Sequence, residues 1–104
     1  FAACSGTMTA LARLYRSIAT QSGGTEAESM NARAAQRDTA ATAFRDFAVS
    51  QGAAIGRSAA DVDRIAKETD ARHAAAAEQQ PMEQFAVALG KEGDACQALA
   101  QTAS

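Results

Sequence analysis

Two cysteines are the residues of this chain whose chemistry constrains its interpretation most strongly. Cys4 lies close to one end of the 104-residue sequence and Cys96 close to the other. A disulfide between them would require an oxidising compartment, whereas two reduced thiols would pack as small apolar side chains. A third alternative treats "FAAC" as the remnant of a lipoprotein box with Cys4 acylated, but lipoprotein processing would remove the three residues before Cys4. We expect the disulfide, for reasons of topology given below.

His73 is the only histidine, with Asp70 one helical turn before it and Asp63 and Glu68 on the same predicted helix. An acid three residues before a histidine is half of the motif used by di-iron bundles. The full site needs two such motifs and further carboxylates. A single histidine cannot supply them, so we expect His73 to face solvent and to pair loosely with Asp70 or Glu68.

Other catalytic and cofactor-binding patterns are not found in the sequence. A nucleophile needs an oriented base, and no glycine-rich elbow lies near His73. The "SGG" at 22–24 is too short for a phosphate loop and no lysine follows it. Met8 lies where b-type bundle cytochromes carry an axial methionine, but the last predicted helix has no histidine to complete a haem site. We predict no metal, no cofactor and no enzymatic activity.

Composition excludes further classes. The net charge is −2, the isoelectric point is near 5.3, and the basic residues are scattered, so nucleic acid is not an expected partner. No run of 18 apolar residues could span a membrane. More than half of the apolar residues are alanine, which favours helices but buries little area. A disulfide would therefore matter more here than in a leucine-rich bundle.

Apolar residues recur with helical spacing throughout, and no stretch alternates with period two. We predict a single all-α domain over residues 1–104, an antiparallel four-helix up-down-up-down bundle. In that topology the start of the first helix and the end of the fourth meet, which brings Cys4 to Cys96 and ties helix one to helix four. The predicted helices cover about 2–20, 26–55, 59–79 and 81–102.

Local signals set these boundaries. Thr25 followed by Glu28 predicts a capping box at the start of the second helix. Ser58 with Asp61 predicts the N-terminus of the third, and Gly56 a left-handed residue ending the second. The proline at 81 separates the last two helices.

Charged residues interrupt two of the apolar stripes. Arg37 falls on the stripe of the second helix and Glu92 on that of the fourth. Buried together, they would form a polar core pair that could mark a ligand site. At the edges of their stripes, both would keep their charged groups in water. The stripe of the fourth helix consists of Met82, Phe85, Leu89, Glu92, Cys96 and Leu99, and that of the second runs on to Ile55.

Small residues on the fourth helix suggest a surface for close helix packing. Ala86, Gly90 and Gly93 lie beside its apolar stripe, and we predict that they form an interaction face for another protein. The oligomeric state is left open.

The chain also resembles small exported helical proteins of proteobacteria, many of unknown function. The resemblance rests on the early "CSG", the alanine-rich middle and the closing "CQAL". It implies a disulfide-stapled helical fold in the periplasm or among secreted proteins, after removal of an upstream signal segment or anchor. It implies no activity. From the lack of catalytic groups and the small residues at Ala86, Gly90 and Gly93, we expect a non-enzymatic accessory subunit or scaffold of a cell-envelope assembly. The alternative is an immunity or inhibitor protein against a secreted toxin or enzyme.

Overall fold

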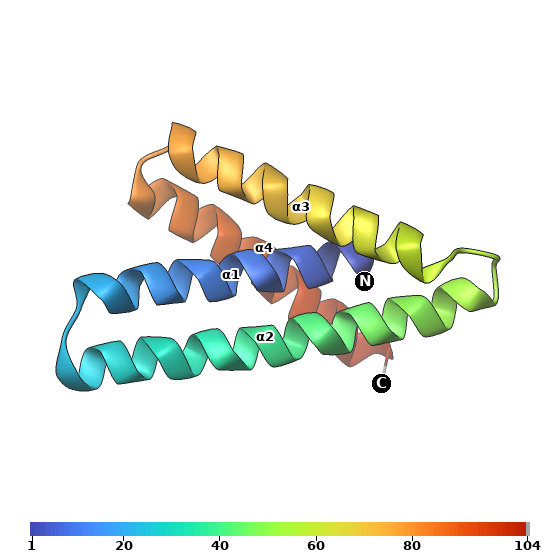
Figure 1. The fold of residues 1–104 in the computed structure, drawn as a ribbon, viewed down its shortest axis with the longest axis horizontal. Coiled ribbons are helices and arrows are strands. Elements are labelled where there is room, and N and C mark those ends of the chain that lie inside the picture. The colour runs from blue at the N-terminus through green and yellow to red at the C-terminus, as the bar shows by residue number, and fades with distance from the viewer. Residues whose placement is uncertain (104) are drawn as a thin grey trace.

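The computed structural model describes residues 1–103 and shows four α-helices, with no strand in that part of the chain (Figure 1). The up-down-up-down order confirms the predicted antiparallel four-helix bundle. Successive helices are joined by short connections. The helices are α1 (Ala2–Gln21), α2 (Gly24–Ala53), α3 (Ala59–Gln79) and α4 (Met82–Ala103).

The connection between α1 and α2 is shorter than predicted. Gly23 is the N-cap of α2, and Gly24, the first helical residue, has a left-handed φ of 57°. A glycine adopts this conformation without a Cβ clash, so the chain reverses direction within two residues. The predicted capping box of Thr25 and Glu28 is therefore wrong. The helix has already begun when the chain reaches Thr25, and no side chain caps it.

The connection between α2 and α3 follows the sequence signals closely. Gly56 has a φ of 78°, and the Arg57 N–H donates to the Gly52 carbonyl at 2.8 Å. This is the long backbone bond of a Schellman motif. Ser58 then caps α3. Its hydroxyl accepts from the Asp61 N–H at 3.2 Å, and the Asp61 carboxylate accepts from the Ser58 N–H at 3.4 Å. Both predicted end signals are confirmed.

Helix α1 is the centre of the bundle. It contacts all three other helices, lying between α2 and α3 in Figure 1 while α4 passes behind it. By contrast, no Cα of α2 lies within 8 Å of a Cα of α4 in the described residues. Helices α2 and α4 therefore approach each other only through their side chains, and both pack against α1.

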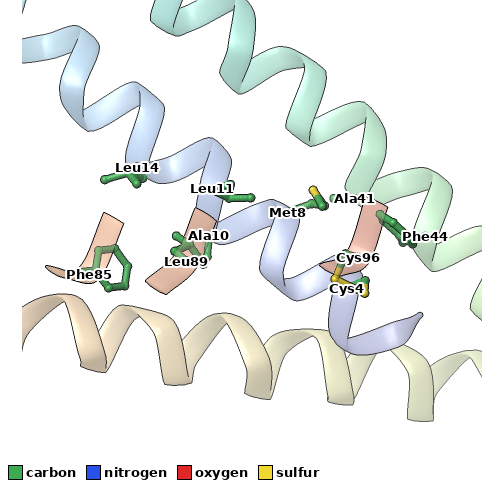
Figure 2. Packing of buried hydrophobic residues seen from close by; sticks show 10 residues of the cluster. All are labelled: Cys4, Met8, Ala10, Leu11, Leu14, Ala41, Phe44, Phe85, Leu89 and Cys96. Atoms are coloured by element: carbon green, nitrogen blue, oxygen red, sulfur yellow. A yellow bond between two sulfur atoms is a disulfide. The ribbon is translucent and has the colours of Figure 1, made fainter. Parts of the chain in front are cut away.

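The core is thin and follows α1. Leu11, Met8 and Leu14 of α1 meet Phe44 of α2 and Leu89 of α4 in the main cluster (Figure 2). A smaller cluster of Ala2, Ala48 and Val62 joins α1, α2 and α3. The remaining members of the main cluster are Cys4, Ala10, Ala41, Phe85 and Cys96.

Three apolar residues on the predicted stripes are exposed instead of buried. Met82 and Leu99 on α4 are 51% and 42% exposed, and Ile55 beyond α2 is 76% exposed. Helix α4 crosses α1 obliquely in Figure 1. Its buried residues run from Phe85 to Cys96, so Met82 and Leu99 lie outside the buried set. Ile55 lies in the turn that ends α2, where the helical period no longer applies.

Candidate binding groove

The Cys4–Cys96 disulfide is present and joins α1 to α4 across 92 residues of sequence. The two Cα atoms are 5.6 Å apart, within the usual range for a disulfide. Both cysteines are buried in the main core cluster, and Figure 2 shows Phe44 of α2 beside them. The bond fixes the C-terminal half of α4 against the first turn of α1.

Immediately beyond the disulfide, the side chains of α2 and α4 enclose an apolar groove. Its volume is about 560 Å³, within the roughly 300–1,000 Å³ that small binding sites occupy. The α4 wall begins at Gln97, the residue after Cys96, so the disulfide sets the position of that wall. The groove is lined by Phe1, Ala40, Ala43, Phe44, Phe47, Gln97, Ala100 and Gln101.

Three phenylalanines form one side of this groove. The ring of Phe1 lies edge-on to Phe47, with centroids 4.4 Å apart, and tilted to Phe44 at 5.9 Å. Phe44 is buried in the core, whereas Phe1 and Phe47 are half-buried. The aromatic side of the groove thus rests on the core and presents ring surface outward.

No charged side chain lines the groove. The interhelical ion pairs lie elsewhere and connect neighbouring helices. Arg13 pairs with Asp70 at 2.7 Å between α1 and α3, and Arg16 pairs with Asp38 between α1 and α2.

Two carboxyl groups with lowered pKa values, Asp61 and Asp63, also take part in structural contacts and not in the groove. Arg45 of α2 donates two hydrogen bonds to Asp63 of α3, at 2.9 and 3.3 Å, and these bonds lower the pKa of Asp63. The pKa of Asp61 is lowered chiefly by the backbone hydrogen bond from Ser58. Because each shift has a structural cause, neither carboxyl group indicates an active site.

The structure corrects the prediction for His73. The residue is buried, 5% exposed, and its Nε2 lies 2.7 Å from Glu92 Oε2 of α4. This close contact is not aligned as a hydrogen bond. Asp70 and Glu68, the predicted partners, pair instead with Arg13 and Arg64. The sequence prediction failed because tertiary packing buries His73 beside Glu92 of α4, and the polar composition of α3 gives no sign of that contact.

For Arg37 and Glu92 the sequence left two alternatives, a buried pair or charged groups at the stripe edges, and the described part of the chain shows no pair between them. The guanidinium of Arg37 lies over the ring of Tyr15, 5.8 Å from its centroid. Glu92 instead contacts His73 and, at 3.6 Å, Arg72. The two residues are on α2 and α4, the helices whose backbones do not approach each other, so no buried polar site exists between them.

The predicted interaction face on α4 is divided between the core and the surface. Gly93 is buried, and a Cβ built there would lie 2.6 Å from Leu11 Cδ1, so this glycine serves the packing of α4 on α1. Ala86 is half-buried against the main cluster. A Cβ at Gly90 would meet nothing within 4 Å. An added side chain therefore has room at Gly90 but not at Gly93, and an interaction face for another protein at these residues stays a prediction.

Sequence reasoning missed the groove. A signal for it exists in the spacing, because Ala40, Ala43 and Phe47 follow one face of α2, and Gln97 and Gln101 are one turn apart on α4. Those two patterns could not be connected without the oblique course of α4.

Comparison with protein-family models, with curated proteins and with solved structures finds no match for this chain. The class is therefore set by the fold, an antiparallel four-helix bundle closed by a disulfide. Over the described residues, no helix has the length and apolar character needed to cross a membrane, and no three metal-ligating side chains gather.

Proposed function

We propose that this protein is a non-enzymatic interaction protein of the cell envelope, an accessory subunit or scaffold that docks a partner protein in the groove between α2 and α4. The groove itself carries the proposal. It combines half-buried aromatic rings with an uncharged lining. Protein interfaces are enriched in aromatic residues and depleted of charge at their centres.

The disulfide supports a location in an oxidising compartment. Disulfides persist in oxidising environments such as the bacterial periplasm and the secreted fraction, and both cysteines of this chain are used in one. We therefore propose the periplasm or the secreted fraction as the location of the protein.

The test is capture of partners from the native envelope with a tagged chain and two variants at one groove position. Ala43 is exposed on α2 and lines the groove, so Ala43→Trp would fill the groove without entering the core. Ala43→Ser is the matched control, and Val87→Ser tests an exposed apolar residue elsewhere on the surface.

We expect a stoichiometric partner with the native chain, with Ala43→Ser and with Val87→Ser, and its loss with Ala43→Trp. Equal capture by Ala43→Trp would contradict the groove as the docking site. The identity of the partner separates the two expected roles. A structural envelope protein would indicate an accessory subunit, and a toxin or secreted enzyme would indicate an inhibitor.

A further inference from the structure

We infer that the connection between α2 and α3 is a cleavage site for a protease that cuts after arginine, and that the cut chain persists as a folded two-chain protein joined by the Cys4–Cys96 disulfide. The distribution of basic residues, the exposure of the connection and the position of the disulfide carry this, independently of the groove.

Arg57 is the only basic residue in a connection between the described helices. The chain has ten lysines and arginines, and the other nine lie inside α1, α2, α3 or α4. Exposed connections are cut far more readily than helices, because a helix must first unfold to enter a protease. The specificity for arginine therefore follows from the position of this one residue.

The connection is fully open to solvent. All residues from 53 to 60 are exposed, and Ile55 is 76% exposed. Figure 1 shows the connection at one end of the molecule. The connection between α3 and α4 is equally exposed, from 77 to 84, but it contains no basic residue. A protease that cuts after arginine therefore has one target outside the helices of the described chain.

Only local contacts hold the connection in place. The Arg57 N–H donates to the Gly52 carbonyl at 2.8 Å, and Ser58 and Asp61 form the capping box at the start of α3. The nearest buried residues on either side are Gly52 and Val62. The segment between them can therefore open without removing a side chain from the core.

Cleavage adds one water across the peptide bond between Arg57 and Ser58, which leaves a carboxylate on Arg57 and an ammonium on Ser58. The new ammonium lies beside the Asp61 carboxylate, which already accepts from the Ser58 N–H at 3.4 Å. A charge-assisted bond then replaces the capping bond. The start of α3 therefore keeps a partner after the cut.

The two halves remain joined after cleavage. The cut separates α1 and α2 from α3 and α4, but the disulfide joins Cys4 of α1 to Cys96 of α4. Packing also crosses the cut, because Val62 of α3 is fully buried against Ala2 and Ala48. Since the chain has only two cysteines, their disulfide becomes the only covalent link between the halves. Reduction then separates the halves of the cut chain, whereas in the intact chain it only lowers stability.

The test begins with digestion of the oxidised protein by a low concentration of trypsin, followed by intact mass and by gels with and without reductant. We expect a first product one water heavier than the parent, which gives fragments 1–57 and 58–104 only after reduction. Arg57→Gln should slow this first cleavage at least about tenfold, since every other basic residue lies in a helix. Arg64→Gln, at an exposed arginine within α3, is the matched control and should be cut like the parent.

The cut protein is then tested for its fold and for its dependence on the disulfide. Without reductant, its circular dichroism spectrum should keep the helical signal of the intact chain. With reductant, the Tm of the cut protein should fall as the protein is diluted, because two separate chains associate by mass action. The Tm of the reduced intact chain should not depend on dilution.

A first cut within any helix, resistance of the parent chain to trypsin, or cleavage of Arg57→Gln at the parental rate would overturn the cleavage site. Loss of the helical signal when the oxidised protein is cut would overturn the folded two-chain product. A Tm of cut, reduced protein that is independent of dilution would overturn the role of the disulfide as the link between the halves.

Discussion

Helices α1 and α4 are held in the bundle by different means. Helix α1 is buried on several faces, and the five consecutive residues from Cys4 to Met8 are all buried. Helix α4 has a single buried stripe, which consists of Phe85, Leu89, Gly93 and Cys96. The disulfide joins both helices, but it matters more for α4, whose interface is small, than for α1, which also packs against α2 and α3. The candidate groove belongs to the more weakly packed of these two regions.

The largest expected effect comes from removing the disulfide with Cys4→Ser and Cys96→Ser together. In the chain-entropy model, a bridge closing a loop of about this length contributes about 4–5 kcal/mol to the free energy of unfolding. Domains of this size have only about 5–15 kcal/mol in total, so the loss would be a large share. Urea denaturation of the variant and of the parent chain measures it.

Hydrogen exchange then distinguishes the two regions in the same variant. We expect amides of α4 to lose protection first, while amides in the middle of α1 and α2 keep more of theirs. Chemically reduced parent protein is the control and should behave like the double variant. Uniform loss of protection across all four helices would contradict the difference between α1 and α4.

The next largest effect on stability is expected from replacing glycines by alanine, which should destabilise the protein on α1 and stabilise it on α4. A Cβ at Gly6 of α1 would lie 2.3 Å from the Ala66 carbonyl oxygen and 2.8 Å from Thr69 Cβ on α3. Backbone cannot yield as a side chain can, so Gly6→Ala should destabilise by about 1–3 kcal/mol or more. Gly90→Ala on α4 meets nothing and should stabilise by up to about 1 kcal/mol. Thermal unfolding of both variants measures the contrast. A lower Tm for Gly90→Ala than for the parent chain would contradict it.

A smaller effect is expected where α3 meets α4. His73→Ala removes a buried side chain and should cost about 1–3 kcal/mol, because a cavity forms and Glu92 loses its closest contact. Glu92→Gln should cost less than about 1 kcal/mol, since the Glu92 side chain is 42% exposed. Arg72→Gln is the control, and its exposed contact at 3.6 Å should contribute almost nothing. Urea denaturation should show this order of losses in the free energy of unfolding. If Arg72→Gln cost as much as His73→Ala, the burial of His73 against Glu92 would not be the main contribution at this contact.

The sequence contains most of the information for the helices and little for the groove. Local signals were sufficient where the cause is local, as with Ser58 and Asp61 at the start of α3 and Gly56 before it. Cys4 and Cys96 were paired correctly because alternating helix direction alone brings those ends together. The capping prediction at Thr25 was wrong because glycine at 24 allows the helix to begin two residues earlier than predicted, with Gly23 as its N-cap.

Predictions that depended on packing between helices were less accurate than those that depended on local signals. An apolar stripe shows which face of a helix is buried, but the angle at which that face crosses its neighbour depends on side-chain packing at the contact. Without the angle, the apolar stripe alone predicts Leu99 to be buried, whereas it is 42% exposed. The burial of His73 beside Glu92 likewise depends on tertiary packing that the polar pattern of α3 does not show.

The smallest expected effect is a pH dependence at the α2–α3 contact, away from α4. Hydrogen bonds from Arg45 lower the pKa of Asp63 below its ordinary value of 3.8. The stabilisation is therefore fully present above that ordinary value and is lost as the pH falls through the lowered pKa. Asp63→Asn cannot titrate, so the difference in Tm between parent and variant should be largest above about pH 5 and should shrink towards pH 2.

The partner residue provides the control for this pH dependence. Arg45→Gln removes the cause of the shift and should reproduce the pH profile of Asp63→Asn, while the double variant should add little to either. Both variants should leave hydrogen exchange in α4 unchanged, because the pair joins α2 to α3 and the disulfide holds α4 independently. A pH profile identical to that of the parent chain in both variants would show that the Arg45–Asp63 pair makes no net contribution.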